Sequence, residues 1–213
     1  MSQRTTVHVM RHGEVYNPTK ILYGRLPGFR LSALGEQMAQ RAGEYFSEKD
    51  IAYVVASPLE RAQQTATPVA QAHGLQLHSD LNLIEADNVF EGERVSVGDG
   101  VLRSPSTWKH LWNPFRPSWG EPYVDIAARM RVAIEAARDA ARGHEAVCVS
   151  HQLPIWVARL DAEKRMFMHD PRKRQCNLAS VTSFVYDDNT LVAVTYAEPA
   201  ADLVEISTRG VGA

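Results

Sequence analysis

The sequence has little of what marks a membrane, secreted or nucleic-acid-binding protein. No apolar run is long enough to span a bilayer, and the amino terminus reaches its first apolar stretch without the hydrophobic region of a signal peptide. A formal net charge of -2 in 213 residues leaves no electrostatic footprint for nucleic acid or an anionic membrane. The two cysteines, Cys148 and Cys176, lack metal-ligand spacing. We therefore expect a cytoplasmic protein with reduced thiols, which binds neither nucleic acid nor membranes.

Strand-like and helix-like segments alternate along most of the chain. β-Rich runs are expected at 7–10, 51–56, 75–83 and 146–149, and helices at 34–47, 59–73, 124–142 and 154–161. Two further β-rich runs, 180–186 and 191–196, are joined by a hairpin-like Asp-Asp-Asn-Thr sequence, and a tail is expected from about residue 200. This order predicts an α/β fold in a single domain over residues 1–213.

The periodic pattern is lost between residues 84 and 123, where glycine and proline are frequent. A connection of this length is unusual in a compact domain unless it forms a lid or a binding element. We expect a lid-like excursion at about residues 86–123. Its aromatic residues either line a substrate mouth or fix the excursion to the body of the protein; they are Trp108, Trp112, Phe115 and Trp119.

Residues that can bind or attack phosphate follow the ends of the predicted strands. In open α/β sheets, the carboxyl ends of the strands form the usual ligand-binding edge. Arginine offers a planar fork of donors for phosphate, and a neutral imidazole is a nucleophile at physiological pH. Together they indicate phosphoryl chemistry at one edge of the sheet. The residues are Arg11, His12, Arg61, Glu85 and His151.

Four motifs in this order resemble those of the histidine phosphatase superfamily, also called phosphoglycerate mutase-like, over nearly the whole chain. They are Arg-His-Gly-Glu at 11–14, Ser-Pro-Leu-Glu-Arg-Ala-Gln-Gln-Thr-Ala at 57–66, the segment from Glu85 to Gly92, and Val-Ser-His at 149–151. The resemblance implies a three-layer α/β/α sandwich with a mostly parallel central sheet.

The resemblance also implies a covalent mechanism. His12 would attack the phosphorus of a phosphomonoester to give a phosphohistidine, while Arg11, Arg61 and His151 hold the phosphoryl oxygens. Glu85 would protonate the leaving oxygen and then act as base toward water. The implied enzyme is a phosphomonoesterase of the histidine acid phosphatase type that acts on a small phosphorylated metabolite. It needs neither a metal nor another cofactor.

Further candidates for contact with the phosphate or the rest of the substrate lie near these motifs. Three positions depart from the common family pattern: Val15 replaces a frequent Thr or Ser, Asn17 falls one residue early, and Gln152 replaces a frequent Gly. The basic run at 172–174 is interpreted as a solvated surface patch, with a polyanionic substrate as the alternative. The identity of the phosphomonoester and the existence of a homodimer stay open. The additional binding candidates are Asn17, Gln152, Tyr23, Gly24 and Arg25.

Three other functions are weighed against phosphatase activity. A cofactor-dependent phosphoglycerate mutase would pass the phosphoryl group to a second hydroxyl, but its Glu-Arg-His-Tyr-Gly segment is replaced here by Glu-Ala-Asp-Asn-Val at 85–89. A non-catalytic phosphate-binding protein would not need the acid Glu85. A metal held by two histidines and Glu85 is disfavoured, because the neighbouring arginines would repel a cation.

Overall fold

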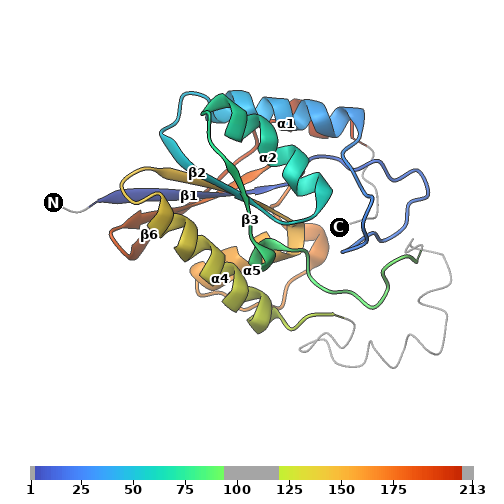
Figure 1. The fold of residues 1–213 in the computed structure, drawn as a ribbon. Helices are drawn as coiled ribbons and strands as arrows, with labels where there is room; N and C mark the ends of the chain where they lie inside the picture. The colour runs from blue at the N-terminus through green and yellow to red at the C-terminus, as the bar shows by residue number, and fades with distance from the viewer. Residues whose placement is uncertain (1–2, 94–119, 208–213) are drawn as a thin grey trace.

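A six-stranded sheet forms the centre of the structure, a computed structural model that describes residues 3–93 and 120–207 (Figure 1). The strand order is β3-β2-β4-β1-β5-β6. The first four of these strands are parallel, and β5 and β6 add an antiparallel hairpin beside β1. The strands are β1 (Arg4–Arg11), β2 (Ile51–Ala56), β3 (Leu77–Ser79), β4 (Glu145–Ser150), β5 (Val181–Asp187) and β6 (Thr190–Ala197).

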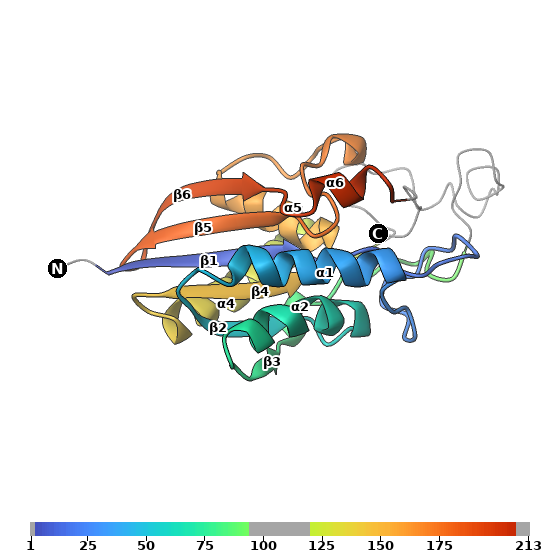
Figure 2. The same cartoon turned by 90° about the horizontal axis from the view of Figure 1, so that it is seen from above.

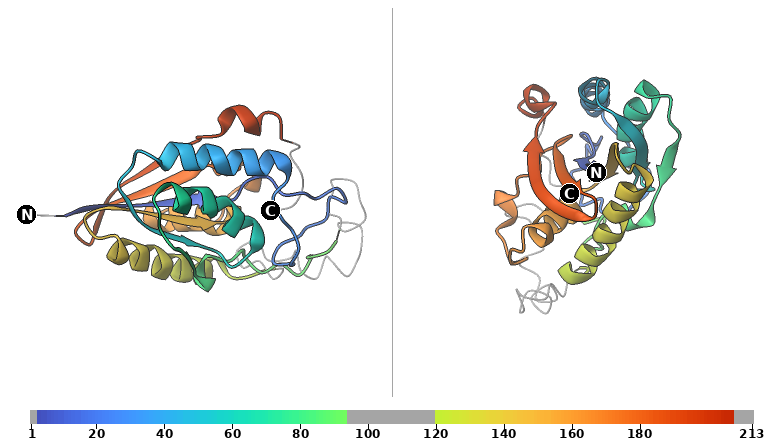
Figure 3. Two further views of the ribbon diagram at one scale, coloured as in Figure 1. Left: turned by 45° about the horizontal axis from the view of Figure 1, so that its top comes forward. Right: turned by 90° about the vertical axis from the view of Figure 1, so that its left-hand side faces the viewer.

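Helices cover both faces of the sheet, which confirms the expected three-layer α/β/α sandwich. One layer holds α1 (Ala33–Phe46) and α2 (Glu60–Ala72), and the opposite layer holds α4 (Tyr123–Ala140) and α5 (Gln152–Ala162) (Figures 1 and 2). Figure 3 shows α1 and α4 on opposite sides of the sheet. Three short elements complete the described chain: η1 (Leu81–Leu83), η3 (Pro171–Lys173) and α6 (Ala201–Val204).

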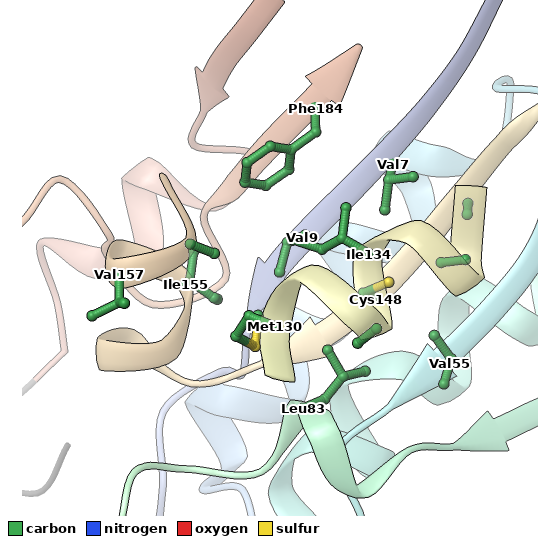
Figure 4. Packing of buried hydrophobic residues seen from close by; sticks show 14 of the residues in the cluster. Val7, Val9, Val55, Leu83, Met130, Ile134, Cys148, Ile155, Val157 and Phe184 are labelled. Atoms are coloured by element: carbon green, nitrogen blue, oxygen red, sulfur yellow. The ribbon is translucent and has the colours of Figure 1, made fainter. Parts of the chain in front are cut away.

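The alternation of side chains along the central strands divides the core into two clusters. Val9 of β1 faces α4 and α5, where it packs with Met130 and Ile155 (Figure 4). The next residue, Met10, faces α1 and α2 and joins the cluster that contains Phe46. All five side chains are buried. Because helices cover both faces of β1, the strand buries apolar side chains on both sides, as is typical of a parallel sheet between helices.

Two predicted segments contain other elements in the structure than the sequence indicates. The run expected to be a strand at 75–83 forms only the short strand β3 and then the 3-10 helix η1, because the Asp80 carboxylate accepts a hydrogen bond from the Asn82 backbone N–H at 2.8 Å and caps that turn. The expected tail contains the short helix α6.

Most of the predicted lid lies outside the described residues, because its residues 94–119 are not among them. The aromatic residues Trp108, Trp112, Phe115 and Trp119 fall in that range. In the part of the chain that the structure describes, no helix is both long and apolar enough to cross a membrane.

Candidate active site

Two histidines leave the same edge of the sheet from neighbouring parallel strands. Arg11 at the end of β1 pairs in register with Ser150 at the end of β4, so that His12 and His151 are the next residues of the two strands. The His12 backbone N–H donates to the Ser150 carbonyl at 3.1 Å. The two imidazole rings are fully buried, and their centres are 5.1 Å apart. The predicted meeting of these motifs at one sheet edge is therefore observed.

The first turn of α2 brings Arg61 to the same place. Its Nη2 donates to the Gly24 carbonyl at 2.6 Å and lies 3.3 Å from Nδ1 of His151, while the guanidinium lies 4.7 Å from the ring centre of Tyr23. Gly24 has a φ of 35°, and a Cβ there would collide with the Glu91 side chain. Glycine at this position therefore permits the close approach of the Glu91 carboxylate, which accepts from the Arg25 backbone N–H at 2.7 Å.

The hydrogen bonds of His12 determine which ring nitrogen is free. Nδ1 lies 2.7 Å from the carbonyl oxygen of Gly13, which can only accept, so Nδ1 carries the proton. Nε2 is buried and has no hydrogen-bond partner among the described residues. Burial, followed by the positive charges of Arg61 and Arg11, holds the pKa of His12 well below its usual value. The imidazole is thus neutral, with an available lone pair on Nε2.

His151 has the opposite arrangement of its two nitrogens. Its Nε2 lies 2.9 Å from Oγ of Ser57, and its Nδ1 faces Nη2 of Arg61, which can only donate. The proton therefore lies on Nε2. Burial, then the charge of Arg61, lowers the pKa of His151 well below its usual value. Nδ1 also lies 3.9 Å from Oε2 of Glu85, which places the carboxyl group next to His151.

Glu85 is buried and has one oxygen available for chemistry. Oε1 accepts from the Ala86 N–H at 2.8 Å, and Oε2 has no hydrogen-bond partner among the described residues. Burial raises the pKa of Glu85, although the Ala86 N–H and the charges of Arg61 and Arg11 act in the opposite sense. A buried carboxyl with a raised pKa can hold a proton near neutral pH and release it to a reacting oxygen.

A network of ion pairs supports the segment that carries Glu85. Nη1 of Arg129, on α4, donates to the carbonyls of Asn82 and Ile84, both at 2.7 Å, and Nε of Arg25 donates to the Glu85 carbonyl at 2.7 Å. Both arginines also bind the carboxylate of Glu121, at 2.7 Å from Arg129 and 2.9 Å from Arg25. Arg25, a predicted substrate contact, is thus engaged with the protein itself.

Four buried polar atoms around these residues have no partner within the described chain. Buried polar atoms are ordinarily hydrogen-bonded, so a cluster of exceptions indicates a ligand-binding site. Two of the four are arginine donors, one is the lone pair of His12, and one is the carboxyl oxygen of Glu85. This set suits an anion that accepts from arginine and is attacked by an imidazole. The four atoms are Nε of Arg11, Nε of Arg61, Nε2 of His12 and Oε2 of Glu85.

The family model of the histidine phosphatase superfamily (branch 1) matches residues 7–199 of the chain. The chain belongs to this superfamily. "Uncharacterized protein Rv0525" of Mycobacterium tuberculosis is 57% identical over 201 residues, which cover 94% of this chain and 100% of that protein. "Probable phosphoglycerate mutase GpmB" of Escherichia coli is 28% identical over 193 residues, covering 82% of this chain and 83% of that protein.

Solved structures share the fold of this chain. Bacillus stearothermophilus YhfR has a TM-score of 0.75 at 24% identity and covers 89% of this chain and 95% of its own. A mycobacterial glucosyl-3-phosphoglycerate phosphatase, Rv2419c, has a TM-score of 0.71 at 23% identity and covers 92% of this chain and 97% of its own. The predicted fold and family are confirmed. The similar proteins include a phosphatase and a probable phosphoglycerate mutase, by their names.

Two of the additional binding candidates hydrogen-bond within the protein. The side chain of Asn17 closes its own loop, donating to the Ile21 carbonyl at 2.8 Å and accepting from the Ile21 N–H at 3.2 Å. Gln152, at the start of α5, donates to the Cys176 carbonyl at 3.4 Å. Arg11 donates to the same carbonyl at 2.8 Å, so Gln152 lies close to the site through a shared acceptor. Direct contact of either side chain with phosphate stays a prediction.

Tyr23, another predicted contact, is buried against the catalytic candidates themselves. Its ring centre lies 6.5 Å from that of His12, and the ring stacks on Phe29. In the described residues, no group of three or more His, Cys, Asp and Glu side chains is placed to hold a metal ion.

Sequence reasoning missed the residues that support the site from a distance. The run at 172–174 is interpreted above as a solvated patch. This fits Arg172, which is exposed and pairs with Asp170 at 3.0 Å, but it is wrong for Arg174. Arg174 is half-buried and lines a cavity of about 200 Å³ beside Glu85. Its contacts lie at His169 and Gln152, and only the basic character of the run could have drawn attention to it.

Proposed function

We propose that the protein hydrolyses phosphomonoesters through a phosphohistidine on Nε2 of His12. The observation that carries the proposal is the cluster of four unpartnered atoms, which supplies two cationic donors, a nucleophile and an acid. Nε2 of His12 forms a bond to phosphorus as the bond to the leaving oxygen breaks, and Glu85 gives its proton to that oxygen. Arg11 and Arg61 hold the remaining phosphoryl oxygens as charge redistributes.

The second half of the reaction uses the same residues. Glu85, now ionised, takes a proton from water as the water oxygen attacks phosphorus. The P–N bond breaks, its electron pair returns to Nε2 of His12, and inorganic phosphate leaves. The hydrogen bond from Nδ1 of His12 to the Gly13 carbonyl supports the positive charge that the ring bears while it is phosphorylated.

His151, expected as a third phosphate ligand, is assigned a role through Arg61. Ser57 fixes the orientation of its ring, and Nδ1 accepts from the Arg61 guanidinium that binds the phosphoryl oxygens. A direct contact with phosphate would need a second proton, on Nδ1, because phosphate oxygens only accept. We place the reaction in the cytoplasm, an assignment supported by two buried cysteines that form no disulfide. Charge neutralisation by arginine supports a mechanism without a metal.

The proposal is tested by phosphate release from a panel of phosphomonoesters, in the presence of a chelator and without added bisphosphoglycerate. We expect turnover by the intact protein and by a His144→Ala control, which changes an exposed histidine that pairs with Asp50. His12→Ala should reduce the rate to background and lose the acid-labile phosphoenzyme that is trapped by rapid quenching.

Turnover that survives in His12→Ala would refute the covalent mechanism. Loss of activity with chelator, restored by a divalent cation, would refute metal independence. If the intact protein releases no phosphate, a primed assay with 3-phosphoglycerate would separate a mutase from a protein that only binds phosphate.

A further inference from the structure

Arg174 differs from most arginines of the described chain in having no acidic partner. Within residues 3–93 and 120–207, the arginines outside ion pairs are Arg4, Arg11, Arg61 and Arg174. Arg4 is exposed at the start of β1, and Arg11 and Arg61 belong to the phosphate site. Arg174 is therefore a half-buried cation that forms no ion pair with a carboxylate of the described chain.

Two neutral acceptors hold the Arg174 guanidinium in place. Nε donates to Nε2 of His169 at 2.8 Å, and Nη1 donates to Oε1 of Gln152 at 3.3 Å. His169 donates from Nδ1 to the Phe167 carbonyl at 2.6 Å, so its Nε2 carries the lone pair that Arg174 needs. Burial lowers the pKa of His169, which favours this neutral form. The guanidinium is thus oriented without being neutralised.

Arg174 lines the cavity of about 200 Å³ that begins at Glu85. Because Glu85 delivers its proton to the leaving oxygen, the leaving group must extend from the phosphoryl group into the space beside Glu85. Glu121 also lines this cavity, but its carboxylate is taken by Arg25 and Arg129. Asp87 is exposed at the wall. Among the described residues that line this cavity, Arg174 is the cation, and it has N–H donors available to a ligand.

We propose that Arg174 binds a second anionic group, a carboxylate or a phosphate, on the leaving group of the substrate. This inference rests on the proposed function, since it assumes that the phosphoryl group lies at His12. A guanidinium suits both kinds of anion, because its fork of N–H donors matches two oxygens of either group. The substrates are then phosphomonoesters of acids rather than of neutral alcohols.

The test compares two ligands that differ in one group. 3-Phosphoglycerate and glycerol 3-phosphate share a phosphorylated three-carbon chain but end in a carboxylate and a hydroxymethyl group. Dissociation constants are measured by calorimetry on His12→Ala, so that no ligand is consumed. Glycerol 1,3-bisphosphate, measured in parallel, shows whether a phosphate is preferred to a carboxylate. We expect 3-phosphoglycerate or glycerol 1,3-bisphosphate, which carry a second anionic group, to bind about 10- to 100-fold more tightly than glycerol 3-phosphate.

Arg174→Gln, added to His12→Ala, should remove this preference and leave the affinity for glycerol 3-phosphate unchanged, which also shows that the variant is folded. Arg172→Gln is the matched control, because it removes an exposed arginine two residues away, and it should keep the preference.

Equal affinity of His12→Ala for the three ligands would overturn the proposal. An equal loss of affinity for all three ligands in Arg174→Gln would overturn it too, because Arg174 would then act on the phosphoryl group or on the fold. A protein that binds none of them would overturn it as well. Failure of the hydrolase proposal would instead appear as absent phosphate release by the protein with His12 intact, whatever the binding preference.

Discussion

Glu85→Gln separates proton transfer from phosphate binding at the site. The substitution keeps the size of the side chain and an oxygen that can accept from the Ala86 N–H, as Oε1 does at 2.8 Å. It removes the proton that burial holds on the carboxyl by raising its pKa. An amide cannot supply that proton, so a leaving oxygen must depart unprotonated or take its proton from water.

The size of the effect depends on the leaving group. A positioned general acid contributes about 10²- to 10⁴-fold, or about 3–5 kcal/mol of barrier. We expect a loss of this size in kcat/KM for an alkyl phosphomonoester, whose leaving alkoxide is very unstable. The kcat/KM for p-nitrophenyl phosphate should change little, because its leaving phenolate is stable without a proton.

The pH profile of kcat/KM also tests proton donation by Glu85. The raised pKa of Glu85 means that the acid form is present at low pH and is lost as pH rises through that pKa, so the rate for alkyl substrates falls on the alkaline side. This fall should disappear in Glu85→Gln. The lowered pKa of His12 places the acidic limb below the usual titration range of histidine.

The assay is the initial rate of phosphate release from about pH 4 to about 9, with both substrates. Glu44→Gln serves as the control, since it changes an exposed carboxylate on α1. A loss in Glu85→Gln that is equal for alkyl and p-nitrophenyl substrates would show that Glu85 acts on the phosphoryl group and would refute proton donation. An unchanged rate for the alkyl substrate would refute it as well.

Three further changes test the surroundings of the site. Ser57→Ala leaves the buried Nε2–H of His151 without its acceptor, and should cost about 1–3 kcal/mol in urea unfolding and weaken phosphate affinity; an unchanged midpoint would contradict this hydrogen bond. Arg129→Met frees the segment before Glu85, and should lower kcat/KM more for alkyl phosphates than for p-nitrophenyl phosphate, whereas an equal loss would argue against positioning. Leu83→Ala empties a fully buried position and should cost about 2–5 kcal/mol in the same unfolding assay; a cost below about 1 kcal/mol would contradict the packing.

The central residues of the site could be predicted because strand ends and chemistry coincide in the sequence. Arg11 and His12 directly follow one apolar run, and His151 follows another. Because the two strands are parallel neighbours, both histidines lie at one edge of the sheet. Arg61 followed from a motif at the start of a helix. These positions depend on local pattern and on one rule of topology.

The supporting residues depend instead on long-range contacts. Arg129 lies in the middle of a regular helix, and only the folded structure shows that its guanidinium reaches the carbonyls of Asn82 and Ile84. In the sequence, Arg174 is part of a basic run, and its contacts with His169 and Gln152 follow only from the folded structure. No periodicity in the sequence reports which carbonyl or ring nitrogen a long side chain reaches.

The place of β1 in the sheet has a consequence for how the chain is made. Of the six strands of the sheet, β1 is synthesised first, yet it lies between β4 and β5, which are the fourth and fifth strands along the chain. Until β4 emerges, β1 has neither of its partner strands, and its unpaired backbone and apolar side chains are open to other chains. Incomplete chains should therefore aggregate, and none that ends before β4 can assemble the pair of histidines.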